Sequence, residues 1–262
     1  MRPAPRSREG RAIRDDHELS EDELALKRRF VAARGYWRDW TDFLLKTSPD
    51  FIDLYARYGG HAADNGPLDA RLCELVYVAL DASSTHMFEP GLKLHLRLAL
   101  EKGASVREIV DVLRLATAQG LHGTLSGIEI LADELGKRGS PPAQAAALDQ
   151  ALADRWTARV GDWPAAYRFL AERDPEFLSL VCEMNELDGE GLARHDEACI
   201  RIALAACFTG YSEHGLRGAI RQALDCAIPA DAILQILQMT AHLGVHSFSL
   251  GAPALNDVLT NR

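Results

Sequence analysis

The sequence lacks any hydrophobic run long enough to cross a membrane. None of its 262 residues lies in a stretch that approaches the roughly 18–20 uninterrupted apolar residues that a spanning helix needs. Five arginines lie between Met1 and Arg14, but no apolar segment follows them, so a secretory signal is not expected. We predict that residues 1–19 form a disordered tail and that the protein has no membrane partner.

Paired cysteine motifs are absent as well. The five cysteines form an odd set with no Cys-x-x-Cys and no zinc-like pairing, which is typical of a reducing cytoplasm. The sequence also has no glycine-rich nucleotide loop, no Gly-x-Ser-x-Gly elbow and no His-Glu-x-x-His. We therefore predict a cytoplasmic protein that uses neither a cofactor nor a metal, with its thiols packed as small hydrophobic side chains.

Positive charge is in deficit. The formal net charge is −9 and the pI is near 5.5. A surface of this sign repels the phosphates of nucleic acids and of anionic membranes, so neither is an expected partner. We therefore expect a small molecule as the partner. A small anion would need a locally positive pocket.

What the sequence does contain is an internal repeat. Gly91–Gly103 aligns with Gly215–Ala227 at an offset of 124, and matching residues continue on both sides of this segment. Further upstream the offset becomes 126, which places a two-residue length change in the loop at 59–67. The repeat predicts a first unit over residues 20–136, a linker over 137–148 and a second unit over 149–262.

Helix signals run through both units. The expected starts are the capping boxes Ser20/Glu23 and Ser105/Glu108 and the prolines Pro49, Pro67 and Pro175, with Pro67 opening a helix to about Ala82. Gly103 is expected to end the helix that begins after Gly91. Alternating apolar patterns with Asn-Gly or Asp-Gly turns are missing. We predict an all-α fold.

The segment Leu92–Leu113, closed by Gln119–Thr124, carries a leucine–histidine–leucine–arginine stretch and ends in small residues. It resembles the core of the carboxymuconolactone decarboxylase family. The resemblance implies an AhpD-like helical fold present as two repeats in one chain. It also implies a homo-oligomer, in which three tandem chains form a trimer equivalent to a ring of six units.

The family that this segment resembles has two chemical branches. The alkylhydroperoxidase (AhpD) branch uses a redox Cys-x-x-Cys, whose positions are occupied here by Phe88 and Gly91 in the first unit and by Ser212 and Gly215 in the second. Because a thiolate is the nucleophile in such redox chemistry, this branch is not expected. The other branch performs cofactor-free acid–base chemistry on lactones and related acids.

His95 matches the histidine of the family motif and is the main catalytic candidate. It lies on the apolar face of its helix, and its counterpart in the second unit is Ala219. A satisfied core histidine is the alternative. Glu89 and His86, which precede the same helix, are predicted to assist, Glu89 as an acid or base whose pKa an apolar pocket raises. A helix-capping role is the alternative for Glu89.

Five further residues are predicted to bind substrate. Arg97 is placed to hold a carboxylate, although an exposed ion pair or an interface role is equally compatible. His122 and His246 recur in both units as pocket walls or packing residues. His242 and His246 are four residues apart, but two ligands alone do not indicate a metal. The predicted substrate-binding residues are Arg97, His122, Glu213, His214 and His246.

These features predict a cofactor-free lyase, either a decarboxylase or an isomerase, that acts on a small carboxylic acid or lactone of aromatic compound catabolism. His95 would protonate the carbon that carbon dioxide leaves. Two alternatives stay open at this point. One is a non-catalytic binding or assembly protein of the same fold, and the other is a thiol peroxidase that uses nonstandard cysteines such as Cys207.

Overall fold

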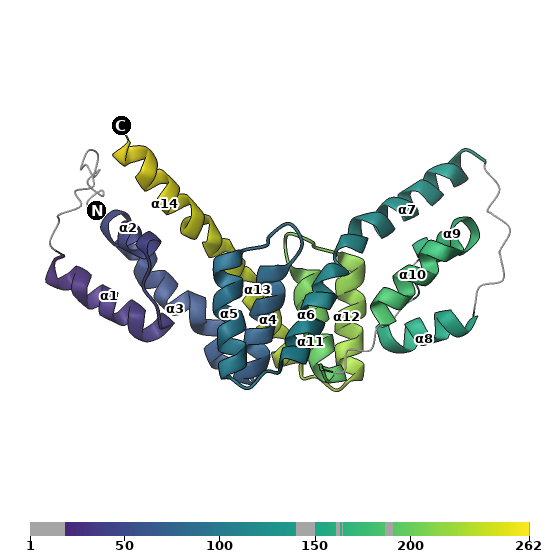
Figure 1. The fold of residues 1–262 in the computed structure, drawn as a ribbon, viewed down its shortest axis with the longest axis horizontal. Coiled ribbons are helices and arrows are strands. Elements are labelled where there is room, and N and C mark those ends of the chain that lie inside the picture. Colours follow the sequence, from purple (N-terminus) through teal and green to yellow (C-terminus); the bar gives the residue numbers. More distant parts are fainter. Residues whose placement is uncertain (1–18, 140–149, 161–162, 164, 187–190, 262) are drawn as a thin grey trace, which may run out of the picture. The chain divides into compact units, whose positions relative to one another are not determined.

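The computed structural model describes residues 19–139, 150–160, 163, 165–186 and 191–261. Every regular element within these ranges is a helix, as predicted (Figure 1). None of the described helices combines the length and apolar character needed to cross a bilayer. Most of the predicted tail and most of the predicted linker lie outside the described residues.

The described residues form fourteen α-helices and one 3₁₀ helix. In chain order they are α1 (Glu21–Arg34), α2 (Asp39–Thr47), α3 (Pro49–Asn65), α4 (Ala70–Ala82), α5 (Glu89–Glu101), α6 (Val106–Thr117), α7 (Gly120–Lys137), α8 (Gln150–Val160), α9 (Ala165–Arg173), α10 (Pro175–Glu186), α11 (Arg194–Ala206), α12 (Glu213–Asp225), α13 (Ala230–Thr240), the 3₁₀ helix η1 (Ala241–Val245) and α14 (His246–Thr260).

Local sequence signals explain most helix starts. Ser20 and Ser105 are N-caps whose hydroxyls accept from the N3 amides, and both capping boxes are complete, as predicted. The prediction that Pro67 opens α4 is wrong, because the helix begins at Ala70. Asp69 caps it by accepting from the amide of Leu72, and a side chain that can accept this bond starts the helix better than proline does.

The helices form two compact units. Among the described residues, the terminal unit comprises 19–61 and 244–261, and the central unit comprises those between 62 and 243. In the terminal unit, α14 packs on α2 over a core that contains Phe30, Trp40 and Ile52. The predicted repeat boundaries divide the sequence differently and stay a prediction.

The central unit has two cores. The larger one lies among α4–α6 and α11–α13, where α4 packs on α5 and α11, and α11 packs on α12 and α13. The smaller one joins α8–α10 to α7 and contains Trp156, Tyr167 and Cys182. Helices α4 and α11 start and end 124 residues apart, and so do α5 and α12, which is the offset of the sequence repeat.

Candidate functional site

Helix α4 places three polar residues along an otherwise apolar stretch. Glu74, Tyr77 and Asp81 follow a spacing of three and then four residues, so they lie on one helix face. Their neighbours in α4 are buried aliphatic side chains, which fix the orientation of this face. Since α5 packs against α4, it brings His95 to the same place.

His95 lies between two carboxyl groups. Its Nδ1 is 2.7 Å from Oε2 of Glu74, and an ionised carboxylate only accepts, so Nδ1 carries the proton and donates. Nε2 is then directed to Oδ2 of Asp81, 4.0 Å away. The ring stacks on Tyr77 with centroids 4.6 Å apart. Glu74 thus sets the tautomer and orientation of the imidazole, and Asp81 faces its reactive nitrogen.

Burial perturbs the two remaining members of this cluster. The side chain of Asp81 is 3% exposed, and desolvation raises its pKa to about 7 against the opposing effect of His95. Burial also lowers the pKa of His86, whose Nε2 lies 3.9 Å from Oδ1 of Asp81. Near neutral pH, the cluster therefore combines a carboxyl group that exchanges a proton readily with imidazole groups beside it.

Gly91 lets α5 approach this carboxyl group closely. A Cβ atom at residue 91 would lie 2.2 Å from Oδ2 of Asp81 and 2.8 Å from the Phe88 ring. The backbone amide of Phe88 also donates to the carbonyl of Asp81 at 2.9 Å. A side chain at residue 91 would thus require the Asp81 carboxyl group or the Phe88 ring to move.

The second half of the chain has no such cluster. At the offset of 124, the positions of Glu74, Tyr77, Asp81 and His95 are taken by Ala198, Arg201, Ala205 and Ala219. All three carboxyl and imidazole groups are replaced by alanine. The asymmetry noted for His95 alone therefore extends to its partners.

Three of the predicted site residues lie outside the cluster, in exposed ion pairs. Glu89 pairs with Lys93, Arg97 with Glu101 and Glu213 with Arg217, each one helical turn apart. The expectation that an apolar pocket raises the pKa of Glu89 is wrong. The hydrogen bond and the charge of Lys93 lower the pKa of Glu89. Because this carboxylate lies in solvent, burial does not raise the pKa enough to offset them.

The predicted histidines are distributed over three places. His95 and His86 belong to the cluster, whereas His122 and His214 line a separate pocket of the central unit. His246 is buried at the start of α14 in the terminal unit. His242 lies in η1 and His246 in α14, so the two do not occupy one regular helix.

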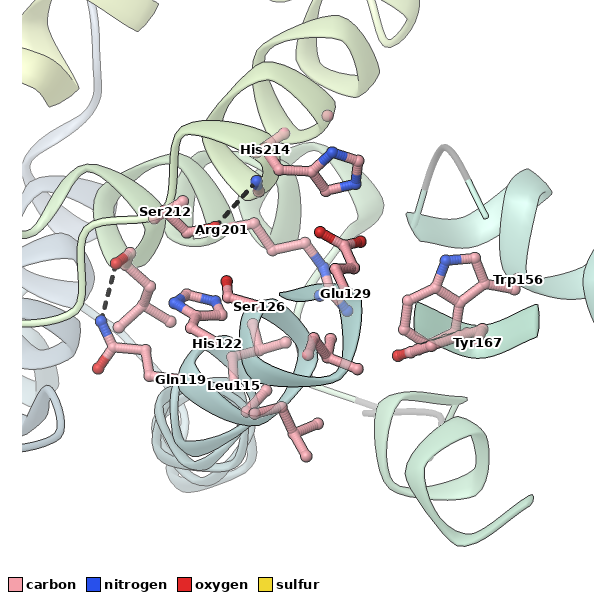
Figure 2. A pocket seen from close by; sticks show the side chains of 18 residues that line it. Leu115, Gln119, His122, Ser126, Glu129, Trp156, Tyr167, Arg201, Ser212 and His214 are labelled. Carbon is pink, nitrogen blue, oxygen red and sulfur yellow. Dashed lines mark hydrogen bonds between the residues drawn. The ribbon is translucent and has the colours of Figure 1, made fainter. Parts of the chain in front are cut away.

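The separate pocket has a volume of about 150 Å³ (Figure 2). Residues of α6, α7, α8, α9, α11 and α12 line it, all within the central unit. Leucine and aromatic side chains make up much of its wall, and its polar members are Gln119, His122, Ser126, Glu129, Tyr167, Arg201, Ser212 and His214. Sequence reasoning found His122 and His214 but missed Arg201 and Tyr167. The exchange of Tyr77 for Arg201 between the repeats was the signal available for Arg201.

Two of the cysteines have environments that disfavour the thiolate form. Burial raises the pKa of Cys73 to about 11 and that of Cys199 to about 12. Cys207 is fully buried, and its sulfur lies within hydrogen-bond range of the Ser83 and Thr209 hydroxyls. These thiols behave as packing residues.

Comparisons with known proteins agree with this architecture. Residues 49–124 match the model of the carboxymuconolactone decarboxylase family. The fold matches a crystal structure of a candidate gamma-carboxymuconolactone decarboxylase subunit from Burkholderia xenovorans LB400, with a TM-score of 0.82 and 27% sequence identity. That match covers 92% of this chain and 98% of the other. A search of curated protein sequences gave no match. Residues 49–124 of the chain are thus similar to the carboxymuconolactone decarboxylase family, and its all-α fold is similar to that of the matched subunit.

Proposed function

We propose that this protein is a cofactor-free, decarboxylase-like enzyme that acts on a small carboxylated lactone or a related acid. The observation that carries the proposal is the position of His95 between Glu74 and the buried Asp81. The family name and the structural neighbour support a decarboxylase-like activity. The cluster supplies what such an activity needs from the protein, namely a positioned proton donor.

In a decarboxylation without a cofactor, the substrate itself must accept the electron pair of the bond that breaks. When carbon dioxide leaves, the bonding electron pair passes into the conjugated carbonyl of the substrate and gives an enolate. The enolate carbon then takes a proton from Nε2 of His95 in its imidazolium form, and solvent later returns the proton. Glu74 stabilises the imidazolium through its hydrogen bond to Nδ1.

Asp81 is the second proton-exchanging group of the cluster. Because burial raises its pKa to about 7, it is partly protonated near neutral pH and can share its proton with His95. The substrate carboxylate is negatively charged, and a neutral Asp81 avoids repelling it. Glu89 and Arg97 no longer belong to the proposed site, since their side chains form exposed ion pairs.

The experiment uses carboxymuconolactone as the probe, and the release of carbon dioxide is measured between pH 5 and 9. The wild-type protein is expected to release carbon dioxide, and His95→Gln should lower the rate by about 10²–10⁴-fold, the usual contribution of a general acid. His61→Gln is the matched control, because His61 is exposed in the terminal unit. Circular dichroism verifies that both variants fold.

Two results would overturn this assignment. One is an unchanged rate in folded His95→Gln, and the other is the absence of turnover in the wild-type protein over the whole pH range. The second result would favour a non-catalytic binding protein of the same fold. Peroxide reduction that is lost after thiol alkylation, without loss of folding, would instead favour the thiol peroxidase.

We also propose that the protein assembles as a homotrimer with six equivalent positions around a ring. Helix α7 has no buried residue although it carries Ile130 and Leu131, which are 64% and 48% exposed. Leu255, the counterpart of Leu131 at the offset of 124, is 49% exposed on α14. Equivalent exposed leucines in both halves are what a ring of repeated units would cover.

A further inference from the structure

The pocket shown in Figure 2 shares no residue with the His95 cluster. Its walls come from α6, α7 and the α8–α9 region on one side and from α11 and α12 on the other. Ala219 lines it at the position that corresponds to His95, so the second half keeps a cavity where the first half has its histidine. A cavity without that catalytic group points to binding.

Tyr167 is the most informative residue of this pocket. Its side chain is fully buried, and its hydroxyl has no hydrogen-bond partner among the residues that the structure describes. Figure 2 shows the oxygen on the side of the ring that faces the pocket. Burial raises the pKa of this phenol, so the hydroxyl stays protonated and remains a donor. A buried donor aimed into a cavity is suited to an oxygen atom of a ligand.

Arg201 supplies further donors. Its Nε and Nη2 both donate to Oε1 of Glu197, at 2.9 and 2.7 Å. These two bonds position the guanidinium and offset its charge, while the planar group retains further N–H donors. The charge of Arg201 also acts on the Tyr167 phenol, which places the two groups near each other.

Acceptors complete the pocket. Nδ1 of His122 lies 2.9 Å from the carbonyl oxygen of Gly210 and must donate to it, because a carbonyl only accepts. In the neutral imidazole, Nε2 is then an acceptor. The Glu129 carboxylate adds a second acceptor among the lining residues. A ligand oxygen that both accepts and donates would find partners of each kind.

Size and charge narrow the ligand class. A volume of about 150 Å³ accommodates one six-membered ring, since engineered cavities of that size bind benzene. Trp156 and several leucines provide apolar surface for the ring. Glu197 already offsets Arg201, and Glu129 adds negative charge, so a carboxylate ligand is disfavoured. We propose that this pocket binds an uncharged one-ring compound that carries a hydroxyl group, a phenol, through Tyr167 and Arg201.

The test is a titration of the full-length protein with phenol, followed by protein-observed NMR. Phenol is expected to bind the wild-type protein, and Tyr167→Phe should weaken the binding about tenfold, since it removes one buried hydrogen bond without changing the shape of the pocket. The variant should fold, because the hydroxyl it removes has no partner among the described residues. Tyr58→Phe, at an exposed tyrosine of the terminal unit, is the matched control.

Two further ligands distinguish the chemistry. Benzoate tests for an anion site, and toluene tests for a purely apolar cavity. The proposal expects phenol to bind more tightly than either. It is overturned if phenol does not bind, if Tyr167→Phe binds it as tightly as the wild type does, or if benzoate or toluene binds as well as phenol. None of these outcomes depends on carbon dioxide release, so the proposal stands or fails separately from the proposed activity.

Discussion

Asp81 has its charge suppressed by the packing around it. Burial penalises the charged form of a carboxyl group, and here the favoured protonation state changes close to physiological pH. The same burial gives the residue two effects at once. It makes Asp81 useful as a proton-exchanging group, and it makes the ionisation of this residue unfavourable for folding.

The cost of ionising Asp81 predicts a dependence of stability on pH. Because burial raises its pKa from 3.8 to about 7, the folded protein retains a proton that the unfolded chain releases between these values. The contribution of Asp81 to the free energy of unfolding is therefore greatest at low pH, falls as the pH rises from about 4 to 7, and is constant above this range. Each unit of pKa shift corresponds to about 1.4 kcal/mol.

Urea unfolding of the wild type and of Asp81→Asn at pH 5 and pH 8 measures this contribution. The amide that replaces the carboxyl group cannot ionise, so the stability of the variant relative to the wild type should increase from pH 5 to pH 8. A difference that is constant with pH would contradict the burial argument.

At the scale of the helices, Arg71 joins three elements of the larger core. From α4 its guanidinium bonds Asp196 of α11 at 2.6 Å and Glu108 of α6, and the Asp196 bond raises the pKa of Arg71. These bonds are mostly shielded from water, because the acidic side chains of Glu108 and Asp196 are only 14% and 10% exposed. Such shielded, charge-assisted bonds are worth more than those at the surface.

Replacing Arg71 by Gln should therefore lower the free energy of unfolding by about 2 kcal/mol, since it leaves two carboxylates in the core without their cation. Arg97→Gln breaks the exposed pair with Glu101 and should cost less than about 0.5 kcal/mol. Urea unfolding at pH 7 compares the two variants. Equal costs would show that Arg71 is no more than a surface charge.

The sequence was sufficient to predict an all-helical fold and several helix ends, because caps, prolines and apolar spacing act locally. It was not sufficient to find Glu74 and Asp81, whose role depends on the packing of α5 against α4. One signal was nevertheless present. Glu74, Tyr77 and Asp81 interrupt an apolar helix at the spacing of one face, and the repeat has Ala198 and Ala205 at the positions of the two acids. Glu89 was overestimated because its exposure depends on how α5 packs, whereas its spacing of four residues from Lys93 already allowed an ion pair on one helix face.

For the whole molecule, the proposed trimer has a measurable mass. Size-exclusion chromatography with light scattering should give about three times the 28.8 kDa of one chain. Leu131→Asp, on the exposed face of α7, should shift the protein toward smaller species, because a charge in an apolar interface remains unpaired. Val31→Asp, at an exposed position of α1, is the matched control. A monomer at all concentrations would refute the ring.

The close approach at Gly91 affects which side chains residue 91 can carry without disturbing the cluster. Residue 91 is the position that the resemblance aligns with the second cysteine of the thiol branch, and any side chain there begins with a Cβ atom 2.2 Å from Oδ2 of Asp81. A cysteine at residue 91 would therefore require the Asp81 carboxyl group to move from its place beside His95. At this position, a thiol and the acid–base cluster compete for the same space.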